Sequence, residues 1–496
     1  MKRALPAAGQ LACRPSRAGA ASAACVAVAF LATSIVAAPP ASAAAADKLG
    51  NYSSAQSMAV QENGRIVVAR ATQSCPEQLV QCTDAAAVVT RYLPSGRIDR
   101  SFGGSDGLVT IPVGGDYYRS VYPGVTGLAI QDDGKIVVGV ARHPDPFVVP
   151  QAFLLMRLRA GGKLDRGFGD GGMVVTPAER FIASETGNGI AISADGSILV
   201  AGSHDPAGLP GPEFAAARYL PDGTLDPSFG TAGVASVRFT EGDDFDLATT
   251  VEQASTVGLR PGGRILLGGG VGNGFVANFA LAQLDPSGQP DPSFGSEGRV
   301  TFGAFQAQFA GAQAVALEIG SDGGALYAGL RGGGEHPSCS KAILARLSPG
   351  GTLVGGFGDA GLVQTAPPVC EGASDLELQG NRMLIAGPGP DFLRRNRVVV
   401  ERYNQDGSVD RSFAGDGAAV FKVAGFEGGA YDLAVVKGGR ILTAGFVLAE
   451  NCGLARAKGK AKDLCEAVAL LRLTRNGHLD PEFGRGGIVT TPRIRR

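Results

Sequence analysis

The stretch Arg218-Tyr-Leu-Pro-Asp-Gly-Thr-Leu-Asp-Pro-Ser-Phe-Gly230 decides how this 496-residue chain is organised, because close relatives of it recur along the sequence. Every copy contains a phenylalanine, and successive phenylalanines lie 56 to 70 residues apart. They are Phe102, Phe168, Phe229, Phe294, Phe357, Phe413 and Phe483. A recurring period of this length is typical of folds built from one repeated supersecondary unit.

A second element precedes each copy, a turn followed by an apolar strand. Its seven versions are Asn63-Gly-Arg-Ile, Asp133-Gly-Lys-Ile, Asp195-Gly-Ser-Ile, Gly262-Gly-Arg-Ile, Asp322-Gly-Gly-Ala, Gly380-Asn-Arg-Met and Gly438-Gly-Arg-Ile. An Asp-Gly link between apolar runs predicts a hairpin with a two-residue turn. Each unit therefore holds four short strands, a to d, in unit two at about 125–131, 135–141, 152–158 and 172–176.

Strands b and c are apolar on both faces, as in Ile136-Val-Val and Phe153-Leu-Leu-Met, so each small sheet is expected to be covered on both sides. Four-stranded antiparallel sheets stacked face to face form propeller blades. The sequence thus predicts an all-β, seven-bladed β-propeller over residues 44–496. The expected blades span about 52–111, 117–176, 186–237, 251–302, 310–365, 372–421 and 428–491. An open solenoid is disfavoured, because the first and last units do not resemble capping repeats.

Arginine and aspartate recur eight residues apart around the link between strands c and d. The pairs are Arg91 and Asp99, Arg157 and Asp165, Arg218 and Asp226, Arg402 and Asp410, and Arg472 and Asp480. Gln283 replaces the arginine of unit four, and Val354 replaces the aspartate of unit five. We expect an ion pair across the link, with the aspartate also forming an Asx turn. A feature present once per blade does not mark one active site, so its predicted role is structural.

These motifs resemble the delta-60 repeat family of bacterial β-propeller proteins. The resemblance rests on Asp133-Gly-Lys-Ile-Val-Val138, on Arg218 to Gly230 and on their counterparts, and it covers about 52–491. Units five and six depart most, with Val354, Ala414 and Gly380-Asn381 at motif positions. The resemblance implies a secreted or surface propeller and supplies no catalytic residues.

The N-terminus has the features of a signal peptide. Lys2, Arg3, Arg14 and Arg17 precede an apolar run from about Ala18 to Ala38, and Ala41-Ser42-Ala43 fits a cleavage site. A retained membrane anchor is the alternative, because the run is long enough to span a bilayer. The prolines that follow the run favour cleavage after residue 43. We therefore expect a mature protein that is secreted or at the cell surface or in the periplasm, without a membrane span.

Composition and motifs exclude several classes of function. The chain has 45 basic and 46 acidic residues and no Trp, so no polybasic nucleic-acid surface is expected. The sequence contains no Gly-x-Ser-x-Gly, Walker loop or His-Glu-x-x-His motif. No cofactor and no enzyme class is indicated, although residues from distant loops could still converge to form a catalytic site.

The loops between strands define two faces of the expected propeller. The a–b and c–d links, the turn face, are short and repetitive, whereas the b–c and d–a loops, the loop face, vary in every unit. Scaffolded variable loops often bind ligands, so the loop face is the predicted working face. The six cysteines that follow the signal peptide all map to the loop face. They are predicted to pair as Cys75–Cys82, Cys339–Cys370 and Cys452–Cys465.

Three groups of loop residues are candidate sites. His143, His204 and His336 follow strand b in three units and suggest a metal site, although they could equally be exposed loop histidines. Asp243, Asp244 and Asp246 suggest a Ca²⁺ site, against the alternative of a solvated acidic loop. Tyr117, Tyr118 and Tyr122 suit contact with a protein or a glycan, or packing against the next blade.

The predicted function is a monomeric exported binding scaffold that uses the loop face to hold a protein or glycan partner outside the cell. Two alternatives remain open. One is a propeller lyase or hydrolase with its site at the channel mouth, which a cluster of His and acidic residues there would favour. The other is a purely structural surface protein.

Overall fold

The computed structural model describes residues 56–74, 81–113, 117–118, 124–142, 152–177, 181–183, 189–205, 212–239, 251–272, 276–306, 313–331, 341–365, 374–388, 397–423, 428–450 and 464–491. All of them lie in one compact unit, residues 40–496. Within this part of the chain, no helix is long and apolar enough to cross a membrane.

The described residues form seven antiparallel sheets, each made of strands consecutive in sequence. Blades one and two contain β1 (Ser57–Val60), β2 (Ile66–Ser74), β3 (Gln81–Tyr92), β4 (Leu108–Pro112) and β5 (Tyr117–Tyr118), then β6 (Gly124–Ile130), β7 (Ile136–Arg142), β8 (Ala152–Leu158) and β9 (Met173–Pro177). Blades three and four contain β10 (Ile182–Ala183), β11 (Ile190–Ile192), β12 (Ile198–His204), β13 (Glu213–Tyr219) and β14 (Val234–Val237), then β15 (Val251–Leu259), β16 (Ile265–Gly272), β17 (Val276–Leu284) and β18 (Arg299–Gln306).

The remaining blades follow the same order. Blade five contains β19 (Gln313–Ile319), β20 (Ala325–Arg331), β21 (Lys341–Leu347) and β22 (Leu362–Gln364), and blade six contains β23 (Asp375–Gln379), β24 (Arg382–Pro388), β25 (Arg397–Tyr403) and β26 (Ala418–Lys422). Blade seven contains β27 (Gly428–Val436), β28 (Arg440–Glu450), β29 (Leu464–Leu473) and β30 (Ile488–Thr491). The predicted seven-bladed, all-β propeller is thus confirmed. The short strands β5 and β10, which pair with β3 and β12, were not expected.

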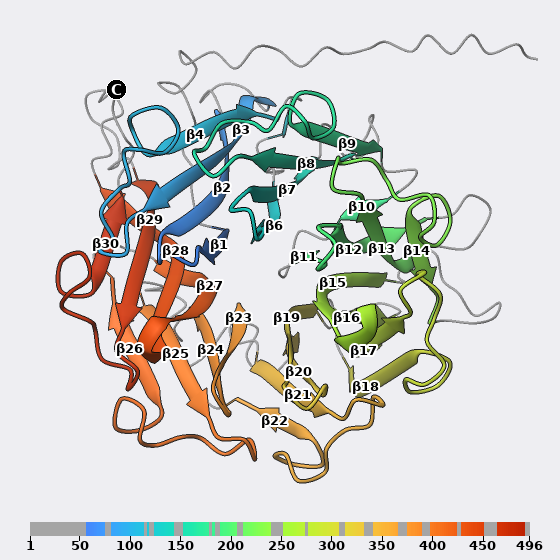
Figure 1. The fold of residues 1–496 in the computed structure, drawn as a ribbon. Helices are drawn as coiled ribbons and strands as arrows, with labels where there is room; N and C mark the ends of the chain where they lie inside the picture. Colours follow the sequence, from blue (N-terminus) through green and yellow to red (C-terminus); the bar gives the residue numbers. More distant parts are fainter. Residues whose placement is uncertain are drawn as a thin grey trace, which may run out of the picture. The chain divides into compact units, whose positions relative to one another are not determined.

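Strand a of each blade lies next to the centre of the ring (Figure 1). These inner strands contact their neighbours in the order β1, β6, β11, β15, β19, β23, β27 and back to β1. Seven hydrophobic cores fill the spaces between adjacent blades, and each contains one of the repeated phenylalanines. All seven phenylalanines are fully buried, so each repeat needs its neighbour to cover its apolar face.

The a–b link differs from the two-residue turn that the sequence predicts. In blade two, the Gln131 N–H donates to the Lys135 carbonyl and the Gly134 N–H donates to the Gln131 carbonyl. The loop is therefore three residues long, and Gly134, at φ +77°, takes the left-handed position that closes such loops. Blade six alone, among the described links, joins strands a and b through two residues, Gly380 and Asn381.

Candidate functional site

The repeated arginine on strand c joins six of the seven blades to the next blade on the turn face. In blade three, Nε of Arg218 donates to Oδ2 of Asp226 at 2.7 Å, and Nη1 donates to the Pro286 carbonyl of blade four at 2.5 Å. Equivalent bonds to the following blade come from Arg91, Arg157, Arg346, Arg402 and Arg472. The sequence-predicted arginines and aspartates are thus brought together, and their effect on stability remains a prediction.

The aspartate of each pair also orders the c–d link. Oδ1 of Asp99 accepts hydrogen bonds from the backbone N–H and the hydroxyl of Ser101, which is the Asx turn expected from the sequence. Burial alone would raise the pKa of Asp99, but the Ser101 bonds and the Arg91 charge outweigh it and lower the pKa to about 2. Because this arrangement recurs around the ring, it supports the scaffold and marks no single site.

A unique site must lie where the repeats differ. The central channel holds a cavity of about 350 Å³ lined by residues from strand a of all seven blades. Four carboxyl groups enter it from three adjacent blades: Glu318 on β19, Asp375 and Glu377 on β23, and Asp432 on β27. The other lining residues are apolar.

The pairing register shows that these carboxyls break the repeat. Glu318 and Glu377 occupy the position that is Ala or Gly in the other five blades, namely Ala59, Ala129, Ala191, Gly258 and Ala434. Two residues earlier, Asp375 and Asp432 stand where the other blades carry Ser57, Gly127, Gly189, Thr256 and Ala316. Residues two apart share one face of a strand, so the four carboxyls form one acidic sector of the channel wall.

The two aspartates are anchored by backbone donors of the following blade. Oδ2 of Asp375 accepts from the Leu433 N–H at 2.8 Å, and Oδ2 of Asp432 accepts from the Met58 N–H at 2.7 Å. The second bond joins blade seven to blade one. Both side chains are therefore fixed in direction. Their carboxyl groups lie near the carboxyl groups of the two glutamates.

Burial and mutual repulsion favour the neutral forms of these carboxyls. Burial raises the pKa of Glu318 to about 7, and burial with the charges of Glu318 and Asp432 raises the pKa of Glu377 to about 8. Burial and the charges of Asp432 and Glu377 raise the pKa of Asp375, and burial raises the pKa of Asp432. Groups that titrate near neutral pH inside a cavity are typical of functional sites.

Among the described residues, no Arg, Lys or His forms an ion pair with these four carboxyls. A cationic group entering the channel would supply the missing charge and displace protons from the glutamates. No three acidic, His or Cys side chains in the described ranges are arranged to hold a metal ion. The cluster therefore offers unpaired carboxyl groups to a cationic group or to proton transfer.

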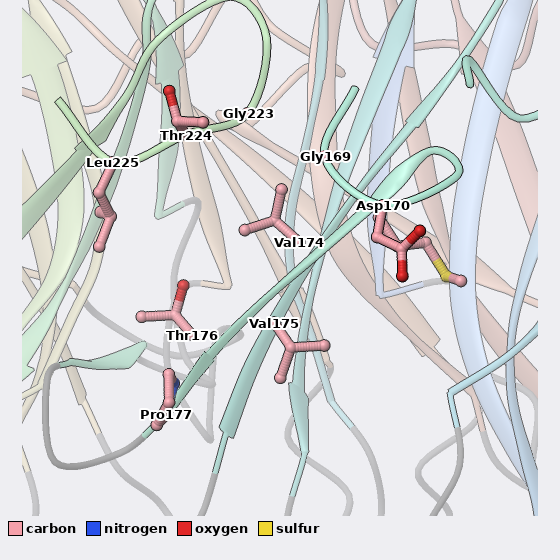
Figure 2. Close-up of a pocket in the computed structure, with 10 residues that line it drawn as sticks. Gly169, Asp170, Val174, Val175, Thr176, Pro177, Gly223, Thr224 and Leu225 are labelled. Atoms are coloured by element: carbon pink, nitrogen blue, oxygen red, sulfur yellow. The ribbon is translucent and has the colours of Figure 1, made fainter. Parts of the chain in front are cut away.

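A larger hollow of about 700 Å³ lies on the outer edge of blade two, between β9 and the c–d link of blade three (Figure 2). Val174 and Val175 project from opposite sides of the strand, and Val175 is 55% exposed. Its ionisable lining is limited to Asp170. With so few polar groups, this hollow offers less chemistry than the channel.

The structure says little about the candidates taken from the loops. His204 ends β12 and is half-buried, and the backbone of Tyr117 and Tyr118 forms β5 opposite Cys82 and Gln81. The other candidates lie outside the residues or side chains that the structure describes: His143, His336, Asp243, Asp244, Asp246, Tyr122 and the six cysteines. The metal, tyrosine and disulfide predictions thus remain predictions.

Sequence reasoning missed the channel carboxyls, although the signal was present. Glu318, Glu377, Asp375 and Asp432 lie in strand a, the least patterned part of the repeat, and the recognisable motifs consist of residues shared by all units. Aligning strand a across the seven units would have revealed acidic residues at a position that is otherwise small and apolar.

Comparisons with known proteins support the fold. A family profile described as "domain of unknown function (DUF5122) beta-propeller" matches residues 193–229 and 261–294. This agrees with a propeller repeat, and the delta-60 assignment itself stays a prediction. No curated protein matches the chain at a significant level.

Several solved structures are similar to the chain at low identity. The chain is similar to polysaccharide lyase Uly1, with 13% identity over 85% of this chain and 90% of the lyase and a TM-score of 0.47. It is similar to an ulvan lyase of family PL25, with 12% identity over 87% of this chain and 95% of the lyase and a TM-score of 0.43. It is also similar to a protein of unknown function from Dyadobacter fermentans, with 12% identity over 86% of this chain and 95% of that protein and a TM-score of 0.37. Likenesses at this level carry no argument about activity.

Proposed function

We propose that this chain is an exported binding propeller of the delta-60 repeat type, whose partner inserts a cationic group into the central channel. The observation that carries the proposal is the acidic sector formed by Glu318, Asp375, Glu377 and Asp432, which lacks a cationic partner among the described residues. Export rests on the signal-like N-terminus and on the even number of cysteines that follow it.

The position of the cluster is consistent with a partner outside the cell that approaches the loop face. Asp375 is the first residue of β23, so it stands where the d–a loop enters the strand. The primary amine of a glycan or a protein is the expected group, because an ammonium is a compact charge that several carboxyl groups can surround. The variable loops would then supply the remaining contacts.

Calorimetric titration with an oligomer of glucosamine tests this proposal, with the N-acetylated oligomer as a matched neutral control. We expect the amine form to bind more tightly and to release protons at pH 7, because cation binding lowers the pKa of Glu318 and Glu377. Proton release is measured by repeating the titration in buffers of different ionisation enthalpy. The Glu318→Gln, Glu377→Gln double variant should lose this preference, and Glu62→Gln, at an exposed turn, should keep it. Equal binding of the two oligomers would contradict the proposal.

A second candidate, a lyase or hydrolase, is favoured by one specific observation. Burial raises the pKa of Glu318 to about 7, and burial with neighbouring charges raises that of Glu377 to about 8. One glutamate can therefore be protonated while the other is ionised near neutral pH, as general acid–base catalysis requires. Release of reducing ends or unsaturated products from a glycan panel, lost in Glu377→Gln, would favour the enzyme. A panel that yields no product with the wild-type protein would leave binding as the function.

A further inference from the structure

Blade four departs from the other blades at its junction with the next blade. In blade three, every donor nitrogen of Arg218 has a partner, because Nη2 also reaches Oγ of Ser228 at 3.4 Å. Blade four has the shorter Gln283 at this position of strand c. Nε2 of Gln283 reaches Oδ2 of Asp291 at 2.9 Å, but the side chain makes no bond to the described residues of blade five.

Arg260, which directly follows strand a, supplies the guanidinium that Gln283 lacks. Its Nη1 donates to Oε1 of Gln283 at 2.5 Å and to the Pro349 carbonyl of blade five at 2.8 Å. Its Cζ lies 5.2 Å from the centre of the Phe294 ring, where five other blades place the arginine of strand c. The bond between blades four and five is thus made by an arginine that follows strand a, and not by an arginine of strand c. The guanidinium therefore reaches the junction from a different direction.

This substitution leaves charged donors without partners. Arg260 is only 7% exposed, and its buried Nε and Nη2 have no hydrogen-bond partner in the described structure. An unsatisfied buried polar group costs about 1–3 kcal/mol, and more when it is charged, so such groups call for a missing partner.

A cavity of about 310 Å³ lies beside Arg260 on the turn face, between blades four and five. It is lined by Arg260, Arg264, Gln283, Ser293, Gly323 and Pro349, among others. The side chain of Arg264 is 50% exposed, so the cavity is reached from solvent. Its volume accommodates several water-sized groups.

The local charge favours an anion. Asp291 is already engaged by Arg264, Gln283 and Ser293. Asp322, the other nearby carboxylate, is engaged by Arg346 at 3.0 Å. Three guanidinium groups therefore face two carboxylates, and burial together with the charge of Arg264 lowers the pKa of Arg260.

We infer that the cavity between blades four and five binds a tetrahedral oxyanion, the sulfate or phosphate group of a ligand, through Arg260 and Arg264. Guanidinium groups present planar arrays of donors that match the oxygens of such anions. A tetrahedral oxyanion supplies three or four acceptor oxygens, enough for both arginines at once, whereas a carboxylate has only two oxygens. This site lies on the turn face and is independent of the function proposed for the channel.

The decisive variant is Gln283→Arg, which recreates the junction found in blade three. The new arginine is expected to hold Asp291 and the Pro349 carbonyl, to displace Arg260 and to fill the cavity while preserving the fold. We expect inorganic sulfate and phosphate to bind to the wild-type protein in calorimetric titrations at constant ionic strength, and this binding to be lost in Gln283→Arg. Equal sulfate affinity in the two proteins would overturn the inference.

A second variant and a second anion sharpen the test. Arg264→Gln keeps the bond from Arg260 to blade five and should weaken sulfate binding about tenfold or more, because hydrogen bonds to charged groups contribute about 1.5–3 kcal/mol. An unchanged affinity in this variant would contradict the assigned ligands. Acetate is expected to bind less tightly than sulfate, and acetate binding as tight as sulfate binding would overturn the tetrahedral assignment. The ratio of sulfate to phosphate affinity then indicates which group the natural ligand carries.

Discussion

The guanidinium at each blade junction makes contacts that only arginine can combine. In blade three, Arg218 holds Asp226 of its own blade and the Pro286 carbonyl of the next, and its Cζ lies 4.4 Å from the centre of the Phe229 ring. Lysine has neither the planar shape nor the spread of donors for these contacts. The repeated phenylalanine, arginine and aspartate therefore act as one unit that seals a pair of blades.

Replacing Asp226 by Asn tests this unit. The substitution removes the charge that Arg218 faces while keeping the shape of the side chain, and it leaves a guanidinium that is only 17% exposed without its counter-ion. We expect a loss of about 1–3 kcal/mol in the free energy of unfolding, measured by thermal or denaturant unfolding. Asp222→Asn, in the exposed turn of the same link, is the control and should change stability little. An unchanged melting temperature in Asp226→Asn would show that the pair is dispensable.

The junctions also tolerate exchange of the residues that make them. Where Val354 replaces the aspartate in blade five, Arg346 instead pairs with Asp322 of the a–b turn at 3.0 Å. Where Gln283 replaces the arginine in blade four, Arg260 takes its place. What stays constant is a bond to the next blade, and the residue that makes it varies.

At the scale of the strands, close approach of backbones requires glycine at one position of strand b. A Cβ at Gly269 of blade four would overlap the Gln253 carbonyl of strand a, and a Cβ at Gly445 of blade seven would overlap the Gly429 carbonyl. A register shift in strand a, between Ala254 and Thr256, lies next to the contact at Gly269. Strands a and b are thus packed too closely for any side chain at this point.

Gly269→Ala should therefore destabilise the protein by about 1–3 kcal/mol, the usual cost of overpacking. The change is measured as a lower melting temperature or denaturant midpoint. Gly161→Ala in the c–d link of blade two is the matched control, because a Cβ there has no neighbour within 4 Å. If both variants melt at the same temperature, strand a can shift to accommodate the added methyl group without a loss of stability.

Strand order was predictable because hydrophobic runs, turns and the repeat period all indicate the same blade. The form of the a–b turn was not predictable, because the Asp-Gly pair at 133–134 fits a two-residue or a three-residue loop equally well. The hydrogen bond from the Gln131 N–H to the Lys135 carbonyl shows that the loop has three residues. The channel cluster was also missed, because the distance between Glu318 and Asp432 in sequence hides their approach across three blades. Residues repeated in every unit indicate the shared structure of the blades. Residues that depart from the repeat, such as the channel carboxyls, indicate the candidate site.

At the scale of the whole molecule, the ring closes without exchanging a strand between its ends. Blade one and blade seven are each built from consecutive strands, and the seam resembles the other junctions made by a strand c arginine. Arg472 donates to the Pro94 carbonyl, the Gly484 N–H donates to the Ser95 carbonyl, and the Tyr92 hydroxyl donates to Thr491. The channel bond from Met58 to Asp432 adds a carboxylate to this seam, which links closure of the ring to the charge of the channel.

The stability of the ring should therefore fall as the pH rises through neutrality. Glu318 and Glu377, with pKa values of about 7 and about 8, bind protons more tightly in the folded than in the unfolded chain, where a glutamate has a pKa of about 4.3. Such groups favour folding at low pH, and this contribution is lost as the pH rises from about 4 to about 8. Asp99, with its pKa lowered to about 2, acts oppositely and loses its contribution only in strong acid.

Melting scans from pH 4 to pH 9 measure this balance. We expect the melting temperature of the wild-type protein to fall between pH 5 and pH 8, and the Glu318→Gln, Glu377→Gln double variant to melt higher than the wild type at pH 8 with a weaker pH dependence. The exposed Glu62→Gln variant should follow the wild-type curve. A double variant that keeps the full wild-type slope would mean that the channel glutamates are ionised in the folded ring, and the acidic sector would then already be neutralised by other groups.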